Sequence, residues 1–278
     1  MTGVAVLGVG TTRFAKQPER TPAELGWEAA AEALADAGVD RVDAVYVGTV
    51  FGAPGVAQRA LQALGIVEVP IVTIEAACAS GTVALHEARE AILSGRYEMV
   101  LALGIEQLST AFAGPIEPEP SDREGRTGLP LPGIYAMSAA RYQAVHGVTD
   151  AELAAVAVKN SAHGALNPRA LRRRGLTEEE ILGSPPIADP LTLYQCCSIS
   201  DAAAAAVVGR ATGTAREVEI AGCAFRSGGL WDQRSEHVWG LDIVRDTATA
   251  AYEEAAVGPD DADLFEVHDA FTIAEIVT

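Results

Sequence analysis

Over about the first hundred residues, short apolar runs rich in β-branched residues alternate with longer alanine-rich stretches whose apolar positions recur at helical spacing. Such alternation is typical of strands and helices that follow one another along the chain. It predicts an α/β fold, with a parallel sheet and helices on its faces. The predicted strands cover residues 4–9, 44–47, 69–74 and 99–104, and the predicted helices cover residues 22–37 and 80–93.

The chain changes character between about residues 114 and 190, where proline, glycine and charged residues become frequent. We interpret this stretch as a loop domain over the sheet. Buried-looking segments resume at residues 202–208 and 217–224. The expected organisation is a first half over residues 1–225, which includes the loop domain, and the start of a second half over residues 226–278.

A short internal repeat points to two related halves. Three residues of the first half recur at a constant offset of 220. In both copies an alanine-rich helix precedes the glycine and a predicted strand follows, over residues 44–47 and 264–267. A duplicated α/β unit explains this pattern, and chance identity in a chain rich in Ala and Asp is the alternative. The matched residues are Gly38 with Gly258, Asp40 with Asp260, and Asp43 with Asp263.

The negative charge of the chain limits the classes of partner that it can bind. Its 278 residues, 49% of them hydrophobic, suffice for one large domain or two ordinary ones with cores. Lys and Arg number 20 against 38 Asp and Glu, so the formal net charge is −18. This field repels nucleic acids and anionic membranes. The N-terminus lacks the basic region of a signal peptide, and no segment approaches a membrane span. We therefore expect a cytoplasmic protein that binds neither nucleic acid nor membrane.

Two further classes of site are not expected. The four cysteines, at positions 78, 196, 197 and 223, fit neither a disulfide framework nor the spacing of a zinc site, so we expect no metal. Gly8-Val-Gly10 follows a predicted strand as in a dinucleotide-binding loop, but Arg13 stands where the third glycine belongs. The sequence therefore does not favour NAD binding.

Cys78 is the first candidate for chemistry. It lies in Glu75-Ala-Ala-Cys-Ala-Ser-Gly81, between a predicted strand and a predicted helix, in a turn that its small neighbours make tight. A thiol at a helix N-terminus faces unpaired N–H groups and the positive end of the dipole, which favour the thiolate and stabilise an oxyanion. An acyl-transfer nucleophile has these requirements. The alternative is a small buried cysteine that packs where the helix meets the strand.

A histidine and an arginine cluster are the other candidates. His268 follows the second predicted copy of the strand, at the end where open α/β sheets bind ligands, and it could donate to a carbonyl oxygen. Its alternative is an exposed loop histidine. Arg169, Arg172, Arg173 and Arg174 form the densest basic cluster of an acidic chain, where an anionic ligand could bind. A solvated helix face is the alternative for these arginines.

Six segments, in order along nearly the whole chain, carry a resemblance to a known family. They are Ala76-Ala-Cys-Ala-Ser-Gly81, Val156-Ala-Val-Lys-Asn160, Leu166-Asn-Pro-Arg169, Ala188-Asp-Pro-Leu-Thr192, Ile199-Ser-Asp-Ala-Ala-Ala204 and Glu266-Val-His-Asp-Ala-Phe-Thr272. The chain resembles the thiolase superfamily, in particular its sterol-carrier-protein and archaeal acetyl-CoA acetyltransferase type. The resemblance implies a layered αβαβα fold of two similar halves, assembled as a homodimer or tetramer. It also implies coenzyme A thioesters as substrates and no bound cofactor.

The resemblance implies a role for each candidate. The chain would be an acyl-CoA C-acyltransferase, active in Claisen condensation or in thiolysis of a 3-oxoacyl-CoA. Cys78 would accept the acyl group, and the enolate of a second acyl-CoA would attack the resulting thioester. His268 would help to hold the thioester oxygen where negative charge develops. Arg169 and Arg172 to Arg174 would contact the phosphates of coenzyme A.

The chain also departs from the family pattern, and the departures leave other functions open. Ala270 stands where this type carries a cysteine thought to act as acid and base, and Ser200-Asp-Ala-Ala replaces a Ser-Asp-Gly-Ala block. The Gly-His-Pro histidine that activates the nucleophile in the family lies in a C-terminal stretch beyond residue 278. We therefore expect a C-terminally truncated chain or one part of a split enzyme, with an incomplete second half.

Two alternatives to acyl transfer follow. One is a retro-aldolase acting on branched or steroid side-chain CoA thioesters. The other is a non-catalytic acyl-CoA-binding scaffold subunit, which, like some members of the group, would bind a small zinc-ribbon/OB-fold partner protein.

Overall fold

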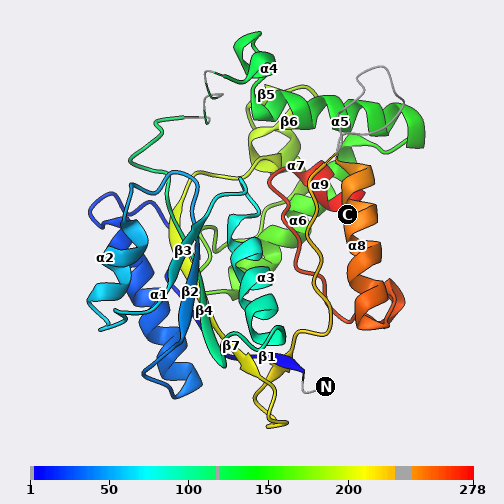
Figure 1. Cartoon of the computed structure of the whole chain (residues 1–278). Coiled ribbons are helices and arrows are strands. Elements are labelled where there is room, and N and C mark those ends of the chain that lie inside the picture. The colour runs from blue at the N-terminus through cyan, green and yellow to red at the C-terminus, as the bar shows by residue number, and fades with distance from the viewer. Residues whose placement is uncertain (1–2, 115, 117–118, 120, 229–239) are drawn as a thin grey trace. The chain divides into compact units, whose positions relative to one another are not determined.

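The computed structural model describes residues 3–114, 116, 119, 121–228 and 240–278 and has two compact units (Figure 1). The first unit consists of Met1–Ala113 with Ser200–Phe225. The second consists of Gly114–Ile199 with Arg226–Thr278.

The first unit is built around a six-stranded sheet in the order β3-β2-β4-β7-β1-β8. Helices α1 and α2 cover one face and α3 the other (Figure 1). The strands are β1 Val4–Thr11, β2 Ala44–Gly48, β3 Ile71–Ile74, β4 Met99–Gln107, β7 Asp201–Arg210 and β8 Val218–Glu219. The helices are α1 Pro22–Ala37, α2 Val56–Gln62 and α3 Ser80–Leu93. The α/β class is confirmed.

The prediction of a parallel sheet is correct for only part of it. Strands β2, β3 and β4 run parallel, as expected for strands joined through helices. Strand β7 is antiparallel to both of its neighbours, β4 and β1. It returns to the centre of the sheet after the long excursion of the chain from residue 108 to residue 200. This connection is far longer than the single-helix crossovers that join the parallel strands, and the sheet is mixed.

The two faces of the sheet are apolar because alternate residues of each strand point to opposite sides. On β4, Leu101 and Leu103 pack against α1 and α2, whereas Val100 and Ala102 pack against α3. All four are at most 5% exposed. This burial on both faces explains why the strands appear in the sequence as continuous apolar runs.

Local signals fix the ends of α1. Thr21 and Glu24 form a reciprocal capping box, Pro22 occupies the first turn, and Gly38 ends the helix with a φ of 70°. The predicted bounds of α1 and α3 are confirmed. On β1, a Cβ at Gly8 or Gly10 would lie 2.3 or 2.2 Å from the α1 backbone. This glycine pair therefore allows close strand–helix packing.

Asp201 joins three parts of the first unit at one edge of the sheet. Its fully buried carboxylate accepts hydrogen bonds from Gln17 N (2.6 Å), Ser109 N (2.8 Å) and Ser109 Oγ (2.5 Å). Burial by itself raises the pKa of the Asp201 carboxyl, but the hydrogen bonds outweigh burial and leave the pKa below its usual value. The carboxylate thus fastens the loop after β1 and the end of β4 to the start of β7.

We expect Asp201→Ala to lower the free energy of unfolding by about 2–4 kcal/mol, because it leaves the part-buried N–H donors of Gln17 and Ser109 without an acceptor. Urea denaturation measures this loss, with the exposed Asp40→Ala as control. Since the pKa of Asp201 is lower in the folded than in the unfolded state, its contribution is present above the unfolded pKa. It is lost as the pH falls through the folded pKa. An Asp201→Ala protein as stable as the Asp40→Ala protein would contradict this role.

The second unit is mostly helical. The interpretation of residues 114–190 as a loop domain did not predict its longest helices in that stretch. Its elements are α4 Arg123–Arg126, α5 Leu131–His146, α6 Asp150–Leu166, α7 Glu178–Leu182, β5 Pro186–Ala188, β6 Leu191–Thr192, η1 Leu193–Gln195, α8 Leu241–Ala255, η2 Pro259–Asp261 and α9 Thr272–Val277. Capping boxes at Thr149 with Glu152 and at Thr177 with Glu180 were available as sequence signals for α6 and α7. None of the described helices combines the length and apolar character needed to cross a membrane.

Two sequence predictions about individual segments are wrong. Residues 264–267 do not form a strand, because no other described strand lies beside them to share backbone hydrogen bonds, and Leu264 is 73% exposed. Residues 217–224 are not a buried segment, since only the two-residue β8 forms there and Val218 is 66% exposed. Of residues 217–224, Ile220 packs against the core between the sheet and α3.

The repeated glycines do not occupy equivalent positions. Gly38 ends α1 in the left-handed region, where its N–H bonds Ala35 O. At the end of α8 the left-handed residue is Ala256, with a φ of 55° and its N–H bonded to Glu253 O. Gly258, the sequence counterpart of Gly38, lies two residues farther on with a φ of −119°. The shared helix-ending geometry therefore recurs at an offset of 218, not at 220.

Candidate functional site

Cys78 lies in the five-residue turn between β3 and α3 of the first unit, as the sequence predicted. Its side chain is exposed. The preceding residue, Ala77, has a φ of 47°, a left-handed conformation that costs a non-glycine residue about 1–3 kcal/mol. Strain of this kind persists only where the surroundings enforce it. The turn therefore presents the thiol at the N-terminal end of a helix.

The start of α3 supplies hydrogen-bond donors close to Cys78 in the sequence. The Ser80 N–H bonds Ala77 O at 3.1 Å, and the Val83 N–H bonds Ala79 O at 2.8 Å. Within the part of the chain that the structure describes, the N–H groups of Gly81 and Thr82 have no backbone acceptor. Such donors, with the helix dipole, can stabilise negative charge on an oxygen or a sulfur.

His268 lies in the second unit, in the irregular segment between η2 and α9, and its side chain is exposed. It lines a pocket of about 250 Å³ together with Tyr135, Ser138 and Ile243. The next residue, Asp269, accepts a hydrogen bond from Asn160 Nδ2 at 2.6 Å. The segment that carries His268 is thereby tied to α6.

Two of the segments that carried the family resemblance meet at α6. Asn160 Nδ2 also donates to Glu275 at 2.8 Å, and Lys159 forms an ion pair with the same carboxylate. Asp269 and Glu275 therefore share one amide as a donor. Sequence reasoning had not assigned a role to either of them or to Asn160, although Asn160 and Asp269 belong to the quoted segments.

The adjacent cysteines of the second unit pair with the segment after His268. Cys197 N–H donates to Ala270 O at 2.7 Å, and Cys196 forms a β-bridge with Phe271. Burial, and to a lesser extent the neighbouring Cys197, raises the pKa of the Cys196 thiol to about 11. Cys196 therefore stays protonated near neutral pH and is a poor nucleophile.

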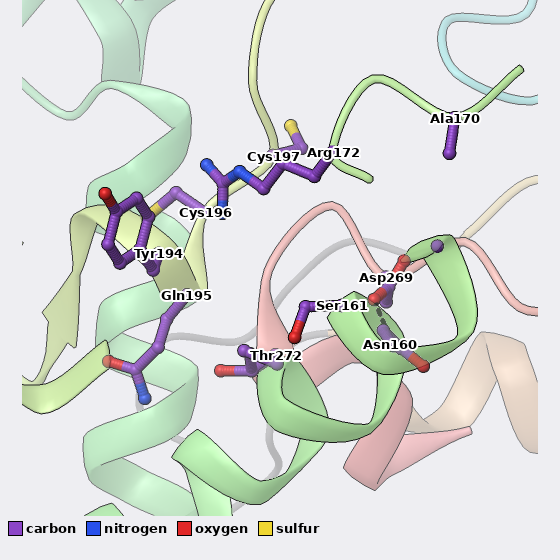
Figure 2. A pocket seen from close by; sticks show the side chains of 12 residues that line it. Asn160, Ser161, Ala170, Arg172, Tyr194, Gln195, Cys196, Cys197, Asp269 and Thr272 are labelled. Atoms are coloured by element: carbon purple, nitrogen blue, oxygen red, sulfur yellow. Dashed lines mark hydrogen bonds between the residues drawn. The ribbon is translucent and has the colours of Figure 1, made fainter. Parts of the chain in front are cut away.

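A pocket of about 260 Å³ opens beside these cysteines, and Figure 2 shows its lining. The Arg172 guanidinium lies 4.6 Å from the centre of the Tyr194 ring and donates to Ser198 Oγ at 3.2 Å. The pocket thus combines a held cation, an aromatic ring and a thiol. It is lined by Ala157, Asn160, Ser161, Gly164, Ala170, Arg172, Tyr194, Gln195, Cys196, Cys197, Asp269 and Thr272.

The four candidate arginines do not share one environment. Arg172 lines the 260 Å³ pocket, which is not lined by Arg169, Arg173 or Arg174. Arg174 pairs with Glu180 on the surface, and Arg173 is exposed. Arg169 is half-buried, with its backbone N–H bonded to Asn167 Oδ1. The four arginines, although adjacent or nearly so in the sequence, therefore do not form a single cationic patch.

The candidate catalytic residues belong to different units, Cys78 to the first and His268 to the second. Within the second unit, Arg172 and His268 line separate pockets. In the described part of the chain, no three His, Cys, Asp or Glu side chains gather in a way that could hold a metal ion.

Comparison with known proteins places these features in a family. Residues 4–212 match the thiolase N-terminal domain. The chain is 37% identical to the benzoylsuccinyl-CoA thiolase subunit BbsB of Thauera aromatica, over 99% of this chain and 74% of that protein. It is 34% identical to the acetyl-CoA acetyltransferase of Methanothermobacter thermautotrophicus, over 100% of this chain and 76% of that protein.

A third relative and a solved structure agree with this match. Sterol carrier protein 2 of Gallus gallus is 31% identical, over 99% of this chain and 55% of that protein. The structure of the Ltp2-ChsH2(DUF35) aldolase superposes with a TM-score of 0.85 at 25% identity, over 99% of this chain and 75% of that one. With the domain match over residues 4–212, these likenesses show that the chain belongs to the thiolase family, among acetyl-CoA acetyltransferases and sterol carrier protein 2.

Proposed function

We propose that the chain is an acyl-CoA C-acyltransferase that works through an acyl-cysteine at Cys78. The Cys78 thiolate attacks the carbonyl carbon of an acyl-CoA and forms a new carbon–sulfur bond. The bond between that carbon and the sulfur of coenzyme A breaks, and the coenzyme A thiolate takes up the proton that the Cys78 thiol had lost. The enolate of a second acyl-CoA then attacks the enzyme thioester, which gives a 3-oxoacyl-CoA and frees the cysteine. Thiolysis is the reverse sequence.

The observation that carries this proposal is the exposed thiol of Cys78 at the start of α3, directly after a residue held in a strained conformation. Free first-turn N–H groups suit the tetrahedral intermediate of acyl transfer. His268 is proposed as a further donor to the thioester oxygen. The names of two relatives, a benzoylsuccinyl-CoA thiolase subunit and an acetyl-CoA acetyltransferase, support CoA thioesters as the substrates.

Mass spectrometry of the protein after incubation with acetyl-CoA tests the proposal directly. We expect an acetyl adduct on the peptide that contains Cys78, and its removal when free coenzyme A is added. Cys196 and Cys197 serve as internal controls in the same digest. An adduct on either of these cysteines in place of Cys78 would overturn the proposed role of Cys78.

A retro-aldolase is the second candidate, and two observations favour it. A solved structure similar to this chain is named an aldolase, at 25% identity. Ala270, which is 7% exposed, also provides no thiol for proton transfer. Aldol cleavage breaks a carbon–carbon bond without an acyl-enzyme. Turnover of a 3-hydroxyacyl-CoA by a Cys78→Ala protein, with no acyl adduct in the wild type, would select this function.

A partner protein is part of the proposal. The relative in Thauera aromatica is named a subunit, and the aldolase structure is named for two components, Ltp2 and ChsH2(DUF35). We propose that this chain likewise acts with a second protein, of the small zinc-ribbon/OB-fold kind, and as a homo-oligomer. Co-expression with such a partner and measurement of the complex mass by light scattering test both statements.

Arg172, which lines the 260 Å³ pocket of the second unit, is proposed to contact a phosphate of coenzyme A. We expect Arg172→Ala to raise the KM for acetyl-CoA about 10-fold with little change in kcat, because one charge-assisted hydrogen bond to a phosphate is lost. Steady-state kinetics measures this shift. Arg96→Ala is the matched control, since Arg96 lies 5.2 Å from the Tyr97 ring in the first unit and lines none of the pockets described. Equal KM values for the two variants would argue against a role of Arg172 in binding.

A further inference from the structure

Two side chains hold the strained turn that precedes Cys78. Glu75 Oε1 accepts a hydrogen bond from the Ala77 N–H at 2.8 Å. Ser80 Oγ donates to Ala77 O at 2.6 Å and accepts from the Ala76 N–H at 2.9 Å. Both polar groups of the residue with positive φ are therefore bonded to side chains. We refer to these three hydrogen bonds as the turn latch.

The turn latch is anchored in the body of the first unit through Ser80. Ser80 is 4% exposed and forms the first residue of α3. Its backbone lies against the end of β2, where a Cβ at Gly48 would come within 2.4 Å of the Ser80 carbonyl. Because Ser80 is buried and its backbone packs closely against Gly48, its hydroxyl is a fixed point for the turn. Glu75, by contrast, is exposed and follows the last residue of β3.

The physical role of the turn latch follows from the preference of alanine. An alanine rarely adopts a φ of 47°, and a turn without restraints would relax Ala77 into the extended or right-handed region. The direction of the following residue depends on that backbone angle, so relaxation would reorient Cys78. Glycine takes both signs of φ with similar ease and would lose less.

We propose that Glu75 and Ser80 are positioning residues that aim the Cys78 thiol at the acyl carbon. This inference rests on the proposed function of Cys78 and adds to it the device that fixes the direction of attack. Glu75 acts as an acceptor oxygen for the Ala77 N–H and not through its charge. A glutamine can therefore replace it, whereas an alanine cannot.

The test combines two measurements on the complete protein. Hydrogen exchange at the Ala76 and Ala77 amides reports whether the turn is held, and the single-turnover rate of Cys78 acetylation by acetyl-CoA reports whether the thiol is aimed. In Glu75→Ala and Ser80→Ala we expect exchange of the amide that lost its acceptor to be about 10-fold faster. We expect acetylation to be about 10- to 100-fold slower in both variants, with an unchanged melting temperature for Glu75→Ala, whose side chain is exposed.

Matched variants distinguish a positioning role of Glu75 and Ser80 from a non-specific effect of the substitutions on the structure. Glu75→Gln should retain acetylation within about threefold of the wild type, because it keeps an acceptor oxygen. Ser94→Ala removes the same kind of bond at the other end of α3, from Ser94 Oγ to Ala91 O at 3.0 Å, and should leave both readouts unchanged. Adding Ala77→Gly to Glu75→Ala should restore part of the acetylation rate, since glycine needs less restraint.

The outcomes distinguish this inference from the proposed function. Unchanged exchange in both alanine variants, or faster exchange with normal acetylation, would overturn the turn latch while Cys78 remains the nucleophile. A wild-type protein with no acetylation of Cys78 would instead overturn the proposed function, and the aiming role with it. If Ser80→Ala does not fold, the two variants of the exposed Glu75 still test the inference. Equal acetylation rates in Glu75→Ala and Glu75→Gln would contradict it.

Discussion

Replacement of Cys78 by serine is expected to reduce acyl transfer to less than about 1% of the wild-type rate, a loss of roughly 3 kcal/mol of barrier stabilisation. The reason is chemical, since a serine hydroxyl without a neighbouring base is a far weaker nucleophile than a cysteine thiolate. The fold should be unaffected, because the side chain is exposed and the change is nearly isosteric. Initial rates of thiolysis and of condensation measure the effect, with thermal melting as the check on folding.

Cys223→Ser provides the matched control for this experiment, because Cys223 is another cysteine of the first unit and is partly buried. It should retain activity. A Cys78→Ser protein that keeps more than about 1% of the wild-type rate would show that the reaction does not pass through an acyl-cysteine at this position. In that case the retro-aldol reaction becomes the leading function.

Replacement of His268 by alanine is expected to lower turnover by on the order of 10²-fold, the usual effect of losing one donor to a developing oxyanion. Acyl-enzyme formation should suffer less than the carbon–carbon bond step. Rapid-quench measurement of the two steps separates them. The exposure of His268 makes a large loss of stability unexpected.

His163→Ala is the control for His268, since His163 is another exposed histidine of the second unit, in the last turn of α6. Its turnover should equal that of the wild type. If His268→Ala is as active as His163→Ala, the imidazole of His268 is not a donor in the rate-limiting step. The proposal for Cys78 would stand, with the first-turn N–H groups of α3 as the oxyanion donors.

Local chemistry accounts for the parts of the fold that were predicted well. The N-terminal cap at Thr21 and the terminal glycine at Gly38 act within a few residues of the ends of α1, so the sequence pattern alone locates that helix. The same holds for Cys78, whose place between an apolar strand and a helix start depends only on neighbouring residues. Short-range signals are readable because their partners are adjacent in the chain.

The direction of β7 and the fate of residues 264–267 could not be read in this way. A strand forms only beside another strand, and which strand that is depends on pairings between distant residues. Thus Asp201–Arg210 runs antiparallel at the centre of the sheet, whereas residues 264–267, equally apolar in pattern, lack a described neighbour and stay irregular. The repeat likewise aligned Gly258 with Gly38, although Ala256 adopts the left-handed geometry.

The candidate site likewise has some features that depend on neighbouring residues and others that depend on long-range contacts. The position of Cys78 just before a helix is a local property of the residues around it, and the sequence alone predicted that position. The binding of Asp269 by Asn160 and the placement of Arg172 over Tyr194 join residues that are 109 and 22 positions apart. Such contacts arise from the packing of whole helices and loops, which no local pattern encodes. Only the folded chain could therefore separate Arg172 from its three neighbouring candidates and reveal the restraint of Ala77 by Glu75 and Ser80.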